Sequence, residues 1–177
     1  MSYSPRLSRP SMAHDVVLEP ASDAEIDALV WLAYHLGARN VVIGHGRDDV
    51  SCMNAARFAR DWEAGGEAVM VQVPWREEAA SWLRQARRLV TPGPDLWVLG
   101  GAATGLAQMT RRLAWSTSWE PCRTLVLGTR TMSEALRLAG GGVLEGVRGA
   151  HSDGALWQIR DDSMEALHPA EVERSQR

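Results

Sequence analysis

The sequence predicts an α/β fold with a mostly parallel central sheet. Short apolar segments alternate along the chain with longer segments whose apolar residues recur at helical spacing. Short segments that are apolar at their centre are typical of strands that are buried on both faces of a parallel sheet. They are residues 40–44, 68–73, 95–99 and 123–127. Strands and helices that alternate in this way form a sheet with helices on both faces.

The first predicted helix begins at a capping signal. Ser22 and Glu25 have the spacing of a capping box, in which each side chain binds an otherwise unpaired backbone N–H. They predict a helix over residues 23–36. Helical spacing of apolar residues predicts the other helices, over residues 50–64, 77–90, 104–115 and 132–139.

The C-terminal part is expected to finish the sheet. Residues 143–147 and 155–159 are predicted to form a hairpin or two short edge strands, and one weak helix is expected over residues 163–167. For domain organisation, we expect the following three parts. They are an N-terminal arm over 1–20, a single α/β domain over 21–162 and a polar tail over 163–177. The domain is expected to be a Rossmann-like α/β/α sandwich with about four to six strands.

Charge and composition exclude several functions. The 177-residue chain has a net charge of −3, so no basic field attracts nucleic acid. All 19 basic residues are arginine, and the absence of lysine excludes Schiff-base chemistry and a P-loop.

Cysteine usage and hydropathy predict a cytoplasmic protein that has no metal site. Cys52 and Cys122 are far apart in sequence, with no CxxC motif and no histidine at ligand spacing. Two isolated thiols suit a reducing compartment. The chain has no apolar run long enough to span a membrane, and residues 1–14 have no apolar segment typical of a signal peptide.

The predicted ligand site is the edge where the parallel strands end. In open parallel sheets, ligands bind beyond the carboxyl ends of the strands. Glycine at such a position lets a ligand approach the backbone closely, although it also makes tight turns that bind nothing. The glycines expected at this site are Gly44, Gly46, Gly100, Gly101, Gly105 and Gly128.

Polar and aromatic side chains in the same loops complete the predicted site. Arg47 and Arg130 follow strands and could each bind a phosphate with two hydrogen bonds, or form surface ion pairs instead. Thr104 and Thr129 lie beside the glycines, and Trp75 could line the crevice and stack on a base. The site therefore suits a nucleotide, the one cofactor that we consider.

Three further residues could carry chemistry. His45 is the histidine of the crevice loops and the candidate general acid or base, unless it only binds its own loop. Asp48 could assist it. Asp48 and Asp49 could also bind a ribose hydroxyl or a metal, or one of them could cap the helix that starts near residue 50.

Residues 100–105, with the sequence GGAATG, lack the spacing of the dinucleotide fingerprint, and no lysine follows them as in a P-loop. The segment resembles the G-G-x-x-x-G turn of the SLOG superfamily, a Rossmann-like group with DNA-processing and cytokinin-activating members. Gly46, Arg47 and Asp48 are similar to a turn found in some of those proteins. The resemblance implies that the glycines and the next helix N-terminus bind a nucleotide phosphate.

Residues 40–127 also resemble nucleoside 2-deoxyribosyltransferase-like proteins. The resemblance rests on a first strand ending in glycine, on Asn54 and Phe58 in the next helix, and on Pro74 after the second strand. The family's catalytic glutamate is replaced, because Gln108 and Met109 stand there. The P-G-G-x-G-T-x-x-E segment of SLOG phosphoribohydrolases is also missing. Both likenesses therefore imply ligand binding more directly than catalysis.

The leading hypothesis is a domain that binds a nucleotide or another phosphorylated small molecule, as a sensor or a weak enzyme. The first alternative is a protein-interaction or homo-oligomerising domain, for which Trp115 and Trp119 would supply a surface. The second is a hydrolase or transferase that uses His45 and Asp48.

Overall fold

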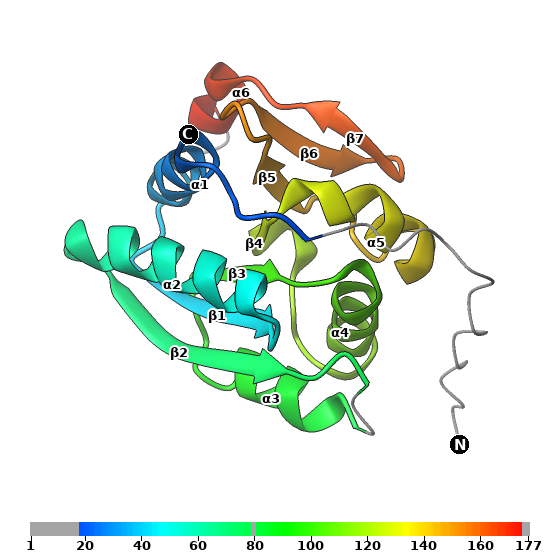
Figure 1. Ribbon diagram of the computed structural model, residues 1–177. Coiled ribbons are helices and arrows are strands. Elements are labelled where there is room, and N and C mark those ends of the chain that lie inside the picture. Colours follow the sequence, from blue (N-terminus) through cyan, green and yellow to red (C-terminus); the bar gives the residue numbers. More distant parts are fainter. Residues whose placement is uncertain (1–17, 79–80, 175–177) are drawn as a thin grey trace.

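The computed structural model describes residues 18–78 and 81–174 (Figure 1). Most of the N-terminal arm expected over residues 1–20 lies outside these ranges.

One seven-stranded sheet forms the centre of the molecule, in the order β2-β1-β3-β4-β5-β6-β7. The first five strands are mutually parallel, and β6 is antiparallel to both of its neighbours, β5 and β7. The strands are β1 (Asn40–Gly46), β2 (Ala68–Trp75), β3 (Leu96–Gly100), β4 (Thr124–Leu127), β5 (Arg148–Ala150), β6 (Leu156–Arg160) and β7 (Ser163–Ala166). The predicted α/β class with a mostly parallel sheet is confirmed, with one strand more than the expected range.

Helices cover both faces of the sheet (Figure 1). Apolar residues of α1, α2 and the segment around α6 form one core layer with the sheet, and those of α3, α4 and α5 form the other. The helices are α1 (Asp23–His35), α2 (Asp49–Ala64), α3 (Leu83–Val90), α4 (Ala103–Ser116), α5 (Met132–Ala139) and α6 (Pro169–Arg174).

Successive side chains of the central strands point to opposite faces of the sheet, so each strand contributes to both core layers. In β1, Val42 faces the α3–α5 layer, whereas Val41 and Ile43 face the α1–α2 layer. In β3, Leu99 and Val98 divide in the same way. These side chains are fully buried, as the uninterrupted apolar sequence of the strands predicts.

Several element boundaries differ from the prediction. β1 continues through His45 to Gly46, so His45 is a strand residue and not a loop residue. α3 begins at Leu83 instead of residue 77, which leaves Glu77 in the connection after β2. These two shifts determine what lies at the carboxyl edge.

The C-terminal elements also differ from the prediction. β5 begins at Arg148, directly after the segment predicted to be a strand over residues 143–147. β7 replaces the helix expected over residues 163–167, because Asp161 and Asp162 adopt positive φ angles of 49° and 56° and turn the chain back into a hairpin.

Gly149 makes room in β5 for a tryptophan of β6. The two residues are paired across the strands, and a Cβ on Gly149 would lie 2.1 Å from the Trp157 ring. We predict that Gly149→Ala lowers the free energy of unfolding by about 1–3 kcal/mol, because Trp157 is buried and cannot move without strain. Urea denaturation measures this loss, and an unchanged midpoint would contradict the packing described here.

Candidate functional site

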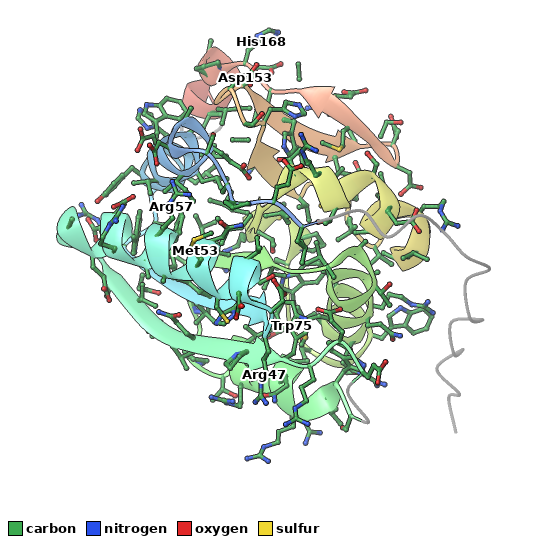
Figure 2. All side chains as sticks on the ribbon, viewed as in Figure 1. Arg47, Met53, Arg57, Trp75, Asp153 and His168 are labelled. Atoms are coloured by element: carbon green, nitrogen blue, oxygen red, sulfur yellow. The ribbon has the colours of Figure 1, made fainter. Side chains whose placement is uncertain are left out.

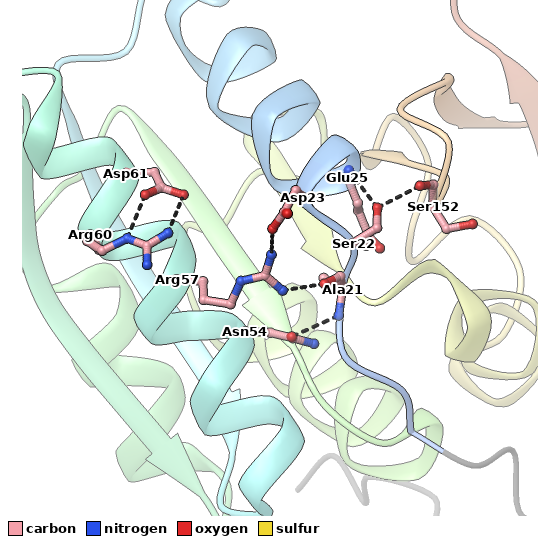
Figure 3. A network of polar contacts seen from close by, with 9 residues as sticks. All are labelled: Ala21, Ser22, Asp23, Glu25, Asn54, Arg57, Arg60, Asp61 and Ser152. Atoms are coloured by element: carbon pink, nitrogen blue, oxygen red, sulfur yellow. Dashed lines mark hydrogen bonds and ion pairs between the residues drawn. The ribbon is translucent and has the colours of Figure 1, made fainter.

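Ser22 joins α1 to the loop after β5. Its Oγ accepts the Glu25 backbone N–H at 3.0 Å and donates to the Ser152 carbonyl at 2.6 Å (Figure 3). The first half of the predicted capping box is therefore confirmed. The hydroxyl also fixes where α1 begins relative to the carboxyl end of β5.

Side chains of α2 hold the segment before α1. Asn54 Oδ1 accepts the Ala21 N–H at 2.9 Å, and Arg57 donates both to the Ala21 carbonyl and to Asp23 (Figure 3). Asn54 is buried, so its hydrogen bond is shielded from water. This segment is thereby held against the sheet edge, where it forms one wall of a pocket.

Glu25 does not complete the capping box. Its carboxylate accepts the Gly128 backbone N–H at 2.9 Å, in the loop that follows β4. Burial raises the pKa of Glu25, while the N–H groups of Gly128 and Thr129 and the charge of Arg57 oppose the rise. The residue is only 4% exposed, so an acidic group lies at the base of this loop.

A pocket of about 140 Å³ opens beside Glu25 at the carboxyl ends of β4 and β5. We call it the β4–β5 pocket. It is lined by Leu18, Glu19, Pro20, Glu25, Gly128, Thr129, Arg130, Thr131, His151 and Ser152.

Thr129 and Arg130 make different contacts in the β4–β5 pocket. Thr129 Oγ1 donates to the Ala150 carbonyl and accepts the indole N–H of Trp157 at 3.0 Å, which fixes its position. Arg130 pairs with Glu19 at 2.8 Å, and both side chains are substantially exposed. The pocket therefore has a floor fixed by hydrogen bonds and an exposed ion pair at its rim.

The carboxyl ends of β1, β2 and β3 meet at a second place, which the Glu77 side chain fills. A Cβ added to Gly105 would lie 2.0 Å from Glu77 Oε2, so the carboxylate rests against the first turn of α4. A Cβ on Gly46 would lie 3.1 Å from Glu77 Oε1. Gly46 and Gly105 both lie against Glu77, so the protein's own carboxylate occupies the space beside them.

We call the side chains around this place the acidic corner, defined as Asp48, Ser51, Trp75 and Glu77. Each has a buried polar atom without a hydrogen-bond partner among the described residues. Burial raises the pKa of Glu77, and the charge of Asp48 raises it further. The nearby Trp75 indole and the Gly105 N–H oppose the rise.

These contacts contradict the predicted phosphate cradle. Two carboxylates face the glycines, and they would repel a phosphate at the distances involved. Trp75 is fully buried and packs at 6.4 Å from Trp82, so it cannot stack on a ligand base. Figure 2 shows Trp75 and Arg47 at this end of the sheet.

The other predicted residues of this corner divide between exposed and buried positions. Arg47 and Thr104 are exposed. Gly44 and Gly100 are packed into the sheet, where an added Cβ would lie 2.8 Å from Trp75 and 3.0 Å from Leu127 Cβ respectively. Both glycines therefore serve close packing within the core.

His45 and Asp48 have structural contacts. His45 is 7% exposed, and its Nδ1 lies 2.6 Å from the Gly46 carbonyl. Asp48 is the N-cap of α2, because its Oδ1 accepts the Ser51 N–H at 2.8 Å. Asp49 is the first residue of that helix. Among the described residues, no group of three His, Cys, Asp or Glu side chains could hold a metal ion.

The predicted site residues thus fall into two groups. Gly128, Thr129 and Arg130 line the β4–β5 pocket, together with Glu25 and His151, which the sequence did not indicate as site residues. Glu25 was interpreted as part of a helix cap. The signal that could have singled it out is a carboxylate on an otherwise apolar helix face.

Solved structures share this fold. No family model and no curated protein matches the chain. A substrate-binding periplasmic protein from Ralstonia solanacearum is 18% identical with a TM-score of 0.65, and the match covers 75% of this chain and 37% of that one. A leucine-binding protein from Thermotoga maritima is 21% identical with a TM-score of 0.58, covering 70% and 35% of the two chains.

A third neighbour is a solute-binding protein of an ABC transporter from Rhodopseudomonas palustris, solved in complex with 3,4-dihydroxybenzoic acid. It is 16% identical with a TM-score of 0.58, covering 72% of this chain and 35% of that one. The chain thus matches little more than a third of the length of these neighbours.

The comparisons correct three of our expectations. The neighbours are solute-binding proteins, which contradicts the expected likeness to SLOG and deoxyribosyltransferase-like domains and, with it, the nucleotide or phosphate ligand. The expected cytoplasmic location is contradicted too, because the neighbours include periplasmic and extracellular binding proteins. A small-molecule ligand in the broad sense is consistent with them.

Two tryptophans were considered for a partner surface. Trp119 is buried and donates to Thr124 Oγ1 at 2.8 Å, so that interpretation is wrong for it. Trp115 is 67% exposed on α4, and a homo-oligomer stays a prediction. No helix within the described ranges is both long enough and apolar enough to cross a membrane.

We predict that Glu25→Gln flattens the pH dependence of stability. A raised pKa in the folded state means that wild-type stability falls as the pH rises through that pKa. Glutamine has no proton to lose and can still accept the Gly128 N–H through its amide oxygen. Urea unfolding between about pH 4 and pH 7.5 should therefore show a smaller loss of stability for the variant.

Glu19→Gln is the matched control for this experiment. Glu19 lies at the same pocket, but its side chain is 49% exposed. Its replacement should leave the wild-type pH dependence in place. A Glu25→Gln curve parallel to that of the wild type would show that the carboxylate carries no burial penalty.

Proposed function

We propose that this chain is a ligand-binding domain that takes a small zwitterionic molecule of the amino acid type in the β4–β5 pocket. The observation that carries the proposal is the lining of the pocket, in which acidic and basic side chains face one cavity. Glu19 and Glu25 supply carboxylates, Arg130 supplies a guanidinium group and His151 supplies an imidazole.

The size and charge of the pocket support this class of ligand. Its volume of about 140 Å³ is below the range of roughly 300–1,000 Å³ that holds drug-sized molecules. A polyanion would meet two carboxylates there, whereas an ammonium and a carboxylate on one molecule could each find an opposite charge. The rigid floor around Thr129 would keep these groups in position.

The fold gives independent support. In parallel α/β sheets, ligands bind beyond the carboxyl ends of the strands, and the β4–β5 pocket lies at that edge. Neighbours of the same fold are named for leucine binding or were solved with an aromatic acid. Both of those ligands carry a carboxylate and are small.

Thermal unfolding with millimolar L-leucine, L-valine or 3,4-dihydroxybenzoate tests the proposal. A ligand at about ten times its Kd adds about 1.4 kcal/mol to the free energy of unfolding. For a chain of this size, that raises Tm by roughly 3–6 °C. We expect the rise with at least one amino acid and none with adenosine monophosphate at equal concentration.

Paired variants locate the binding. Arg130→Ala and His151→Ala should each remove most of the ligand-induced rise in Tm, because both residues line the pocket. Arg137→Ala and His168→Ala are the controls, since both residues are exposed and lie outside the pocket lining. Equal loss in all four variants, or no rise with any amino acid, would refute the proposal.

A further inference from the structure

The helices α3 and α4 together contain five of the chain's 19 basic residues and no acidic residue. The two helices contact each other and cover the same face of the sheet (Figure 1). Because the whole chain has a net charge of −3, its charge is unevenly distributed, and this helix pair is locally basic. We call its outer surface the basic face, defined as Arg84, Arg87, Arg88, Arg111, Arg112 and Trp115.

On α3, the arginines lie on the exposed side of the helix. Leu89 is fully buried against the sheet. Arg84, Arg87 and Arg88 are exposed, and the ion pairs found among the described residues include none of them. Arg88 donates to the neutral side chain of Gln85 at 3.3 Å, which leaves its charge in place. These three guanidinium groups are therefore available to an anionic partner.

The acidic residues nearest in sequence leave the basic face positive. Over residues 76–116 they are Glu77, Glu78 and Asp95. Glu77 fills the acidic corner, and Asp95 Oδ2 accepts two backbone N–H groups around the start of β1. Glu78 is exposed, so one exposed carboxylate stands against the five arginines.

Trp115 adds a large apolar ring to the basic face. The residue is 67% exposed and follows Arg111 by four positions and Arg112 by three, so α4 presents the three side chains as neighbours. An indole combines an apolar ring with a polar N–H, which suits the boundary between water and an apolar medium. The basic face therefore offers positive charge and an interfacial aromatic side chain together.

We propose that the basic face binds the surface of a membrane that contains anionic lipids. Arginine binds phosphate oxygens with paired hydrogen bonds, and the negative potential of an anionic bilayer attracts basic residues near its surface. Tryptophan is enriched where lipid headgroups meet the apolar region, and Trp115 would enter there. The arginines and the exposed indole thus match two adjacent layers of one partner.

The packing of the two helices favours a lipid surface over DNA. Leu89 of α3 and Leu113 of α4 are fully buried, so both helices pack along the sheet and neither protrudes to enter a DNA groove. The arginines are instead spread over the outer side of a helix pair, which suits an extended anionic surface. None of the residues that define the basic face lines the β4–β5 pocket, so this inference does not rest on the function proposed above.

Co-sedimentation of the full chain with lipid vesicles tests the proposal. We expect binding to vesicles of equal parts phosphatidylglycerol and phosphatidylcholine at low salt, little binding to pure phosphatidylcholine, and release at high salt. The double variant Arg84→Gln/Arg88→Gln should bind the anionic vesicles at least about tenfold more weakly. Glutamine is a good helix former, so the exposed side of α3 should remain folded.

The double variant Arg60→Gln/Arg160→Gln is the matched control. It removes the same charge from exposed arginines of α2 and β6, which lie outside the basic face. It should bind the vesicles like the wild type. Equal weakening in both double variants would overturn the proposal, because net charge and not this face would then determine binding.

Vesicles with brominated acyl chains test the position of Trp115, because bromine quenches an indole that enters the bilayer. We expect quenching of the wild-type emission and its loss in Trp115→Phe. Absence of this difference, or of any binding to anionic vesicles at low salt, would overturn the proposal. Tighter binding to a DNA duplex than to the vesicles, measured by anisotropy at the same salt, would also overturn it and assign the face to nucleic acid.

Discussion

Gly46 and Gly105 have no side chains to fill the space at the carboxyl ends of β1, β2 and β3, and the Glu77 carboxylate fills it. A Cβ on Gly105, in the first turn of α4, would lie only 2.0 Å from this side chain, and one on Gly46, at the end of β1, would lie 3.1 Å from it. The carboxylate in turn meets the positive end of α4, which is where an anion is stabilised. The glycines in the sequence suggest an open binding edge, but at β1, β2 and β3 the Glu77 side chain fills that edge.

Glu77 fills the carboxyl edge of the sheet at β1, β2 and β3, and the β4–β5 pocket lies on the remaining part of the same edge. The β4–β5 pocket depends on Glu25, which leaves its own helix cap to hold the Gly128 N–H. It also depends on α2, whose Asn54 and Arg57 fix the chain before α1 as the facing wall. Two buried carboxylates therefore have opposite effects: Glu77 fills a gap, whereas Glu25 supports a loop that borders one.

The periodicity of apolar residues in the sequence was sufficient to predict the fold, but not to predict the site. Apolar strands and amphipathic helices are set by local periodicity, so the helix over residues 132–139 was predicted without error. The contact between Glu77 and Gly105 joins residues 28 positions apart through a side chain that no periodicity specifies. Glu77 was assigned to a helix because its sequence suits one, and the gap that it fills exists only after the strands assemble.

Backbone amide NMR with inorganic phosphate tests the closure of the glycine corner most directly. If Glu77 occupies the first turn of α4, the amide signals of Gly101 and Gly105 should stay in place as phosphate is added to millimolar concentration. Saturable shifts of both signals would show that an anion reaches the glycines. They would contradict the central claim that the protein's own carboxylate holds that position.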